Sequence, residues 1–181
     1  MSVVNVRMKQ RRKTAANWTS ANEVLLDGEI GIETDTRKLK FGDGATAWNS
    51  LPYVGESPGT YTPTWTAVTT NPTLGNGTLT GRYLVTNGLC YVSIFMLGGS
   101  TTTFGSGVWS FSLPFAASAT ATGTAMFFDD GTNFRTGVSQ VVSGASTLSL
   151  TTDAATNNVR SNIPFVWAVN DYLRTSIVYL V

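Results

Sequence analysis

The sequence predicts a mainly β protein with a small β-rich N-terminal domain and an antiparallel β-sandwich or jelly-roll C-terminal domain. Short apolar runs at regular spacing alternate with turn residues along the second part, and no credible long helix interrupts them. Charge is uneven, since residues 1–56 carry 15 of the 23 charged side chains. The composition changes at residues 55–59, where two glycines and a proline indicate a linker.

We therefore expect a domain at residues 1–54, a linker at 55–60 and a second domain at 61–181. Apolar residues make up 42% of the chain, as is usual for a globular protein. No apolar run approaches the ~18 residues of a membrane helix, so no membrane insertion is expected. The basic N-terminus lacks a following apolar segment, so we expect no signal peptide.

The N-terminal segment is expected to begin with a strand near residues 4–8, followed by a short helix. Thr14 is the candidate N-cap for residues 15–18, because its hydroxyl can accept a backbone N–H. A segment of this size alone buries only roughly 60% of its chain surface. Without a disulfide or a metal-ligand cluster, self-association is the remaining means of stabilisation.

A β-hairpin is predicted next. Residues 29–33 and 38–41 alternate apolar with polar side chains, and residues 34–37 supply turn chemistry between them. Ile30 and Ile32 share one face of the first strand. Gly42-Asp43-Gly44 closes the hairpin, because glycine accepts a positive φ at no steric cost.

The second domain contains eight strand-like runs. They are residues 61–68, 77–85, 89–97, 108–113, 122–128, 134–142, 147–151 and 172–180. Asn87-Gly88 and Asp130-Gly131 are favoured in two-residue hairpin turns, in which both central residues need positive φ. Trp109 alternates with other apolar residues and is expected in the core, whereas Trp65 is expected near the joint between the domains.

No catalytic, cofactor-binding or metal-binding residues are expected. The chain has no histidine, which excludes a Ser-His-Asp triad, and its one cysteine, Cys90, is expected to be buried. Asp129 and Asp130 could offer oxygens to Ca²⁺, but the segment lacks the spacing of a calcium loop and is interpreted as a turn. The second domain holds four carboxylates and no glutamate, which disfavours a glycosidase pair.

Four motifs in the first quarter of the chain carry a resemblance. They are RRKTAANW at 11–18, GEIGIETD at 28–35, KFGDG at 40–44 and WNSLPY at 48–53. This run resembles the small N-terminal domain shared by many bacteriophage receptor-binding, tail-fibre and tail-hyaluronidase proteins, with Lys13 where the family usually has glycine. The resemblance implies a virion-attachment domain and an intertwined homotrimer, with strands contributed around a threefold axis.

Three further motifs, YTPTWT at 61–66, LGNGTLTGRY at 74–83 and TFGSGVWSFSLP at 103–114, look like a β-rich C-terminal module of actinophage and related virion proteins. This second resemblance implies a trimeric head. Together the resemblances imply a virion structural protein without enzymatic activity. They leave open whether it is a tail appendage that adheres to the host or a capsid-attached head fibre or decoration protein. A polysaccharide depolymerase is disfavoured, because the catalytic portion of phage hyaluronidases is a long β-helix.

Two groups of residues are candidate binding sites. The basic residues near the N-terminus are expected to pair with carboxylates of a neighbouring subunit or another virion protein of the tail or capsid, rather than with nucleic acid; they are Arg7, Arg11, Arg12 and Lys13. Two polar loops of the second domain are candidates for binding a host cell-surface glycan, although ordinary solvated loops would have the same composition. Their candidate residues are Asp129, Asp130, Asn133, Arg135, Asp153, Asn157, Asn158 and Arg160.

Overall fold

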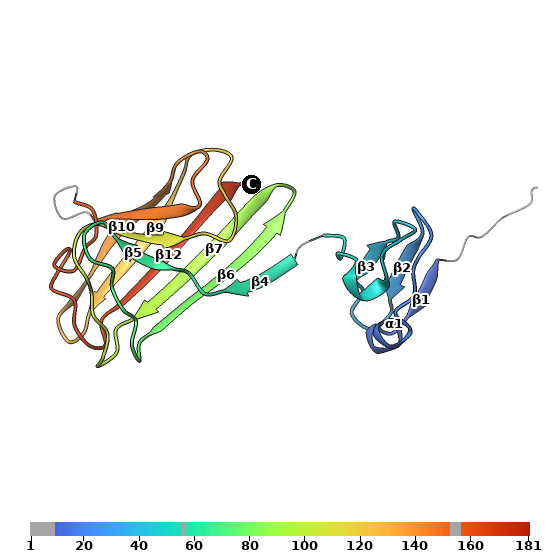
Figure 1. Ribbon diagram of the computed structural model, residues 1–181, viewed down its shortest axis with the longest axis horizontal. Coiled ribbons are helices and arrows are strands. Elements are labelled where there is room, and N and C mark those ends of the chain that lie inside the picture. Colours follow the sequence, from blue (N-terminus) through green and yellow to red (C-terminus); the bar gives the residue numbers. More distant parts are fainter. Residues whose placement is uncertain (1–9, 56, 153–156) are drawn as a thin grey trace, which may run out of the picture. The chain divides into compact units, whose positions relative to one another are not determined.

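The computed structural model describes residues 10–55, 57–152 and 157–181 of the chain. It divides into two compact units, Met1–Glu56 and Ser57–Val181, which Figure 1 shows in the colours of the sequence. Strands predominate in the chain as a whole, so the predicted mainly β class is confirmed.

The first unit is a three-stranded sheet with two short helices. Its elements are β1 (Arg11–Lys13), α1 (Ala15–Ala21), β2 (Ile30–Glu33), β3 (Leu39–Phe41) and the 3-10 helix η1 (Trp48–Ser50). β2 pairs antiparallel with β3, which confirms the predicted hairpin, and β1 pairs parallel with β2. Thr14 caps α1 as expected, since its hydroxyl accepts the Asn17 N–H at 3.3 Å. The strand expected near residues 4–8 lies outside the described residues.

A pair of stacked tryptophans forms the core of the first unit. The rings of Trp18 and Trp48 lie 4.1 Å apart and 12° from parallel, and Leu25 is buried with them. The Trp18 indole N–H donates to the carbonyl of Ile32 at 2.9 Å, which ties α1 to the sheet. Gly31 faces this core, and a Cβ there would lie 2.4 Å from the Trp48 ring. Glycine at this position therefore allows the sheet to approach the tryptophans.

The second unit is a nine-stranded sheet in which all neighbouring strands are antiparallel. The strands are β4 (Ser57–Tyr61), β5 (Trp65–Ala67), β6 (Thr78–Thr86), β7 (Leu89–Leu97), β8 (Trp109–Ser112), β9 (Ala121–Asp129), β10 (Asn133–Val141), β11 (Thr147–Thr152) and β12 (Tyr172–Leu180). Their order across the sheet is β4-β6-β7-β12-β9-β10-β11-β8-β5. The nine strands therefore form one continuous sheet, whereas two packed sheets were expected.

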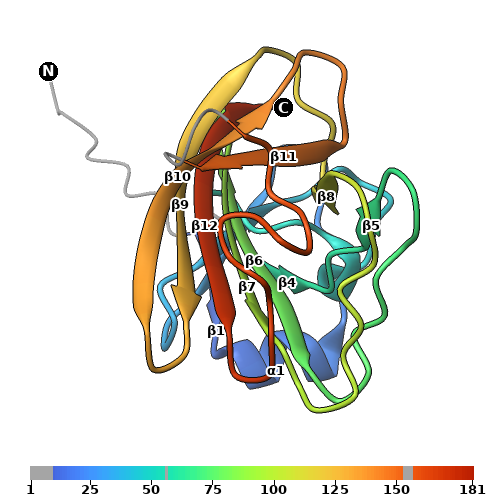
Figure 2. The same cartoon turned by 90° about the vertical axis from the view of Figure 1, so that its left-hand side faces the viewer.

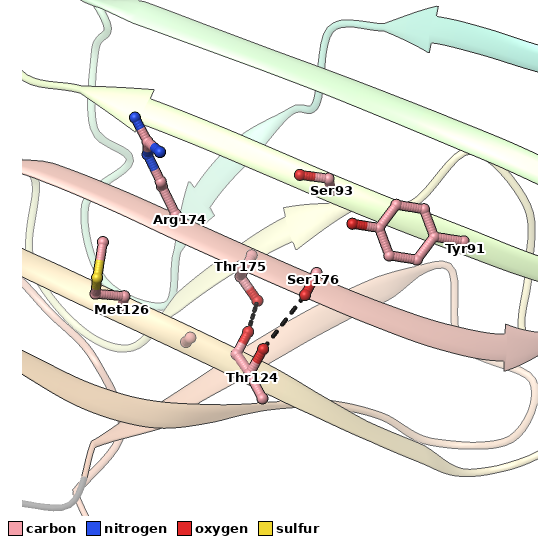
Figure 3. Close-up of a pocket in the computed structure, with 8 residues that line it drawn as sticks. Tyr91, Ser93, Thr124, Met126, Arg174, Thr175 and Ser176 are labelled. Carbon is pink, nitrogen blue, oxygen red and sulfur yellow. Dashed lines mark hydrogen bonds between the residues drawn. The ribbon is translucent and has the colours of Figure 1, made fainter.

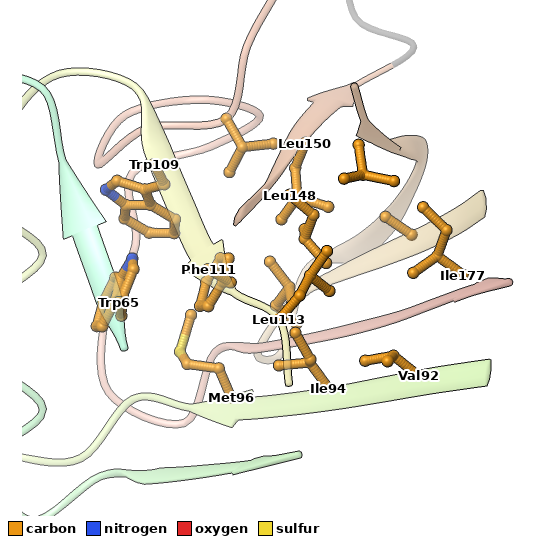
Figure 4. Close-up of a cluster of buried hydrophobic side chains, with 14 of the residues drawn as sticks. Trp65, Val92, Ile94, Met96, Trp109, Phe111, Leu113, Leu148, Leu150 and Ile177 are labelled. Carbon is orange, nitrogen blue, oxygen red and sulfur yellow. The ribbon is translucent and has the colours of Figure 1, made fainter. Parts of the chain in front are cut away.

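The sheet curls so that β5, β8 and β11 face β6 and β7 across a shared core, as the turned view in Figure 2 shows. Alternate side chains of each strand point into this core, and Figure 4 shows those of β5, β7, β8, β11 and β12 converging. Trp109 is buried there as predicted. Trp65 was expected near the joint between the domains, but its side chain is buried in this core, with its ring 4.7 Å from that of Trp109.

The expected strand at residues 61–68 contains only β5 and the last residue of β4, and these two strands lie at opposite edges of the sheet. β4 pairs with β6, whereas β5 pairs with β8. Pro63 lies between them, and proline has no N–H to continue a strand ladder. β4 also occupies most of the segment that the sequence indicated as a linker, because Pro58 and Gly59 pair with residues of β6.

The two expected hairpin turns have different geometries. Asn87 and Gly88 both have positive φ, at 47° and 79°, and connect β6 to β7 as predicted. The prediction of a two-residue turn at Asp130-Gly131 was wrong. The loop between Asp129 and Asn133 has three residues, and only Gly131 has positive φ, at 77°. A three-residue loop needs glycine only at the left-handed position.

Candidate functional site

The basic residues of the N-terminal unit divide between the two faces of its sheet. Arg11 and Lys13 lie on the core face, where both pair with Glu23, and the Lys13 ammonium lies 2.8 Å from that carboxylate. Both cations also lie over the Trp18 ring, at 5.6 and 5.0 Å from its centroid. Arg11 and Lys13 therefore both have a carboxylate partner, Glu23, within the same chain. Arg7 lies outside the described residues.

The opposite face of this small sheet carries its apolar side chains. Arg12 pairs with Ile32, which pairs with Leu39, and Ile30 pairs with Phe41, so these five residues share one face. Phe41 is 49% exposed, and Arg12 forms no ion pair with any residue that the structure describes. The first unit thus presents an apolar surface with an available guanidinium at its margin. We call these five residues the outer face of the first unit.

The core face of the same sheet buries charged side chains instead. Lys40 is 4% exposed, and its ammonium donates to the Trp48 carbonyl at 2.8 Å and lies 4.2 Å from the Tyr53 ring centroid. Burial lowers the pKa of Lys40, and the nearby Glu33 carboxylate opposes that shift. Glu33 accepts the Tyr53 hydroxyl at 2.6 Å, which raises the pKa of Tyr53 to about 12. These contacts hold the chain after η1 against the sheet, so their role is structural.

Four of the predicted host-binding residues lie in the β9–β10 turn or on the strand ends beside it. The Asp130 backbone N–H donates to the buried Asp171 carboxylate at 2.9 Å, so this turn is fixed to the start of β12. The Asn133 side chain accepts the N–H of Phe134 at 2.8 Å. Asp130, Asn133 and Arg135 are exposed, whereas Asp129 is half-buried. The exposed side chains of these three residues are available to a ligand.

The second predicted loop follows β11. Asp153 lies outside the described residues. Asn158 is exposed and forms an isolated β-bridge with Thr151. The Asn157 carbonyl accepts the Thr152 N–H at 3.0 Å. Arg160 is half-buried. β10 and β11 are antiparallel, so the start of β10 and the end of β11 lie at the same end of the sheet. Both predicted loops are therefore connected to that end.

Another polar site lies on the outer face of the second unit's sheet, away from those loops. An open depression of about 250 Å³ is lined by side chains of β7, β9 and β12. Figure 3 shows Tyr91 and Ser93 on β7, Arg174 and Ser176 on β12, and Thr124 on β9 around it. The hydroxyls of Thr124 and Ser176 lie 3.3 Å apart. An adjoining depression of about 220 Å³ shares Tyr91, Thr124 and Ser176, so the two form one groove.

This groove was not predicted from the sequence. Hydroxyl residues at alternate strand positions look like any solvated sheet face. Arg174 was the available signal, as a charge within an otherwise uncharged terminal strand. The neighbours of β12 are β7 and β9, which are far from it and from each other in sequence. No alternation within one strand could therefore have brought these residues together.

The described residues contain no group of three or more potential metal ligands from His, Cys, Asp and Glu. Cys90 is buried, and desolvation raises the pKa of its thiol. No described helix is long and apolar enough to cross a membrane.

Comparisons with known proteins agree with the resemblance in the first unit. Residues 8–46 match the model of the major tropism determinant N-terminal domain. A Mu-like prophage FluMu defective tail fiber protein of Haemophilus influenzae is 39% identical over 116 residues, covering 60% of this chain and 18% of that protein. This match is longer than the first unit and so includes part of the second.

Two further relatives are each named hyaluronoglucosaminidase, from Streptococcus pyogenes phages H4489A and H10403. They are 41% and 37% identical over 51 residues, covering 28% of this chain and 14% and 15% of those proteins. The chain therefore spans less than a fifth of the length of the curated relatives it matches. No solved structure matches the chain significantly.

The chain is therefore similar, over its first unit and part of its second, to a phage tail fiber protein. Within the first unit, residues 8–46 are similar to the major tropism determinant N-terminal domain.

Proposed function

We propose that the chain is a homotrimeric structural appendage of a bacteriophage tail, in which the first unit attaches to the particle and the second adheres to the host surface. The observation that carries this proposal is the tropism-determinant N-terminal domain within a compact unit, joined to a separate and larger β unit. Such an arrangement separates attachment from recognition. The virion is the expected location of the protein.

The outer face of the first unit supports the trimer. Its four apolar side chains, Ile30, Ile32, Leu39 and Phe41, lie on the side of the sheet opposite the tryptophan core. An isolated unit of this size gains little from its own core, and three copies could bury this face against one another. Arg12 at the margin is then placed to meet a carboxylate of a neighbouring copy or of another virion protein.

The tail fiber relative favours a tail location over a head fibre or a capsid decoration protein. The hyaluronoglucosaminidase matches cover only 51 residues, fewer than the first unit contains. They support a shared attachment domain and give no support to shared catalysis. We therefore propose a structural role without enzymatic activity.

Two measurements test the proposal. Electron microscopy of intact particles with an antibody against the second unit should place the label on the tail, and label confined to the capsid would reject the tail assignment. Light scattering of the purified full chain should give three times the chain mass of 19.3 kDa. A stable monomer at micromolar concentration would reject the trimer.

A further inference from the structure

A row of small polar side chains crosses the outer face of the second unit's sheet. The strand registers place Arg82 beside Ser93, Ser93 beside Ser176, and Ser176 beside Thr124. Residues directly opposite one another on neighbouring strands share a face and lie about 5 Å apart. The row therefore runs across β6, β7, β12 and β9, perpendicular to the strands.

Larger side chains border this row on both sides. Tyr91 pairs with Val178 on one side, and Phe95 pairs with Arg174, which pairs with Met126, on the other. The depressions of about 250 and 220 Å³ lie within these borders. The groove therefore results from small hydroxyl residues between two rows of large ones, built on the rigid centre of the sheet. We call it the hydroxyl groove.

The charged side chains around the hydroxyl groove are all positive. Arg82 and Arg174 point outward from β6 and β12, and none of the outward-facing residues of β6, β7, β9, β10 and β12 is an aspartate or a glutamate. Arg174 lies over the rings of Phe95 and Tyr172, at 5.2 and 5.4 Å from their centroids, and has no ion pair among the residues that the structure describes. Stacking orients the guanidinium while its N–H groups remain able to donate.

This chemistry fits an anionic carbohydrate. Serine and threonine hydroxyls both donate and accept, so they match sugar hydroxyls. Tyr91, 44% exposed, offers an aromatic surface for the apolar face of a sugar ring. Guanidinium groups bind carboxylate, sulfate and phosphate groups with paired hydrogen bonds. We propose that the hydroxyl groove binds an acidic polysaccharide laid across the strands, which rests on the proposed host-surface adhesion.

A second copy of the chain fits this groove less well. Interface centres are depleted of charged residues, whereas Arg174 lines this groove and Arg82 lies at the end of its polar row, and their face of the sheet supplies no carboxylate. The loops at the end of the sheet also fit an acidic ligand less well, because the β9–β10 turn carries Asp129 and Asp130. Glycan contact is therefore expected on the strands and not on the loops.

Binding of three defined polymers to the purified full chain tests the proposal. We expect oligogalacturonate or heparin to bind with an affinity that falls as salt is added, since exposed charges are screened within about 8 Å at physiological salt. Neutral dextran should bind more weakly than the anionic polymers. Binding of neither anionic polymer, or equal binding of dextran, overturns the proposal. Carboxylate and sulfate ligands are distinguished by which anionic polymer binds more tightly.

Variants locate the site. The double variant R82Q/R174Q should lose roughly tenfold or more in affinity, as expected for the loss of charge-assisted hydrogen bonds. The matched control is R135Q, because Arg135 is exposed but pairs with the core-facing Phe127 and so lies on the other face. Y91A should also weaken binding. Equal losses in R135Q and the double variant would overturn the assignment to the groove.

Two further readouts distinguish this inference from the proposed function. If wild-type chain adheres to host cells and R82Q/R174Q adheres equally well, adhesion stands and the hydroxyl groove is rejected. If the polymers bind through the groove but the wild-type chain does not adhere to cells, the groove stands and host adhesion is rejected. If the double variant dissociates the oligomer and wild-type chain binds no polymer, the face is a subunit contact and the inference is overturned.

Discussion

The carboxylate of Asp43 shows how a short turn sets the charge state of one residue. It accepts the N–H groups of Ala45 and Thr46 at 3.0 and 2.7 Å and the Thr46 hydroxyl at 2.6 Å. These hydrogen bonds, the Thr46 hydroxyl foremost, lower the pKa of Asp43 to about 2. Because this value is below that of an unfolded aspartate, about 3.9, the turn contributes stability at higher pH and loses it as pH falls from about 4 to about 2.

Thr46→Ala should raise the pKa of Asp43, because it removes the hydroxyl donor while the two backbone N–H groups remain. The measurement is an NMR titration of the Asp43 carboxyl carbon in the full chain. Thr46→Ser keeps a hydroxyl and is the matched control, for which the midpoint should stay near the wild-type value of about 2. An unchanged midpoint in Thr46→Ala would show that the hydroxyl does not stabilise the carboxylate.

Asp171 has the opposite environment, because it is 1% exposed and burial raises its pKa. It accepts the backbone N–H groups of Asp130 and Ala168 at 2.9 and 2.6 Å. Asp171→Ala would leave both donors without this acceptor and should cost about 1–3 kcal/mol of unfolding free energy for each donor that water cannot reach. Chemical denaturation followed by the fluorescence of the second unit measures the loss.

Asp130→Ala is the matched control for that change. It removes an exposed carboxylate from the same turn but keeps the backbone N–H that Asp171 accepts. We expect its unfolding free energy to stay within about 0.5 kcal/mol of wild type, as is usual for surface substitutions. Equal destabilisation by the two variants would contradict the structural role given to Asp171.

At the scale of elements, β2 shows that an alternating strand can place its apolar side outward. Gly31 and Glu33 face the tryptophans, whereas Ile30 and Ile32 lie on the outer face of the first unit. Gly31 can face inward because it lacks a Cβ, for which the Trp48 ring leaves no room at this position. Lys40 faces inward because its ammonium donates a hydrogen bond to the Trp48 carbonyl. The arrangement makes sense if the outer face is covered by another copy.

Ile32→Lys should dissociate the proposed trimer while each chain stays folded, because a charge in an apolar contact opposes burial. Light scattering measures the mass, and circular dichroism checks the fold. Gly31→Ala is the contrasting variant on the same strand. Its Cβ would overlap the Trp48 ring, so it should lower the stability of the first unit by about 1–3 kcal/mol. A trimer that persists in Ile32→Lys would reject this face as the contact.

Local chemistry predicted individual elements well and their arrangement less well. The Thr14 cap, the 29–41 hairpin and the Asn87-Gly88 turn each depend on neighbouring residues, and the structure contains all three. The separation of β4 from β5 was missed, although Pro63 was visible, because strand partners lie far away in the sequence. The hydroxyl groove was missed for the same reason, since it forms only where β7, β12 and β9 lie side by side.

At the scale of the whole molecule, charge and binding chemistry divide between the two units. The first unit carries most of the charged residues, but its sheet already satisfies Arg11 and Lys13 through Glu23. The second unit has few charged residues, and the outer face of its sheet carries hydroxyls together with Arg82 and Arg174. A charge change at Arg12 should therefore affect attachment without affecting the groove, whereas a change at Arg11 would also disturb the fold of the first unit.

Arg12→Glu should reduce the number of copies incorporated into phage particles, because Arg12 belongs to the predicted basic group and forms no ion pair with any described residue. Quantitative immunoblotting of purified particles measures copy number against a major virion protein. Arg135→Glu makes the same charge change on the second unit and should leave incorporation unchanged. A normal copy number in Arg12→Glu particles would place the attachment surface elsewhere. A drop in both variants would point instead to a general effect of net charge, since rim charges mainly steer association and fix register.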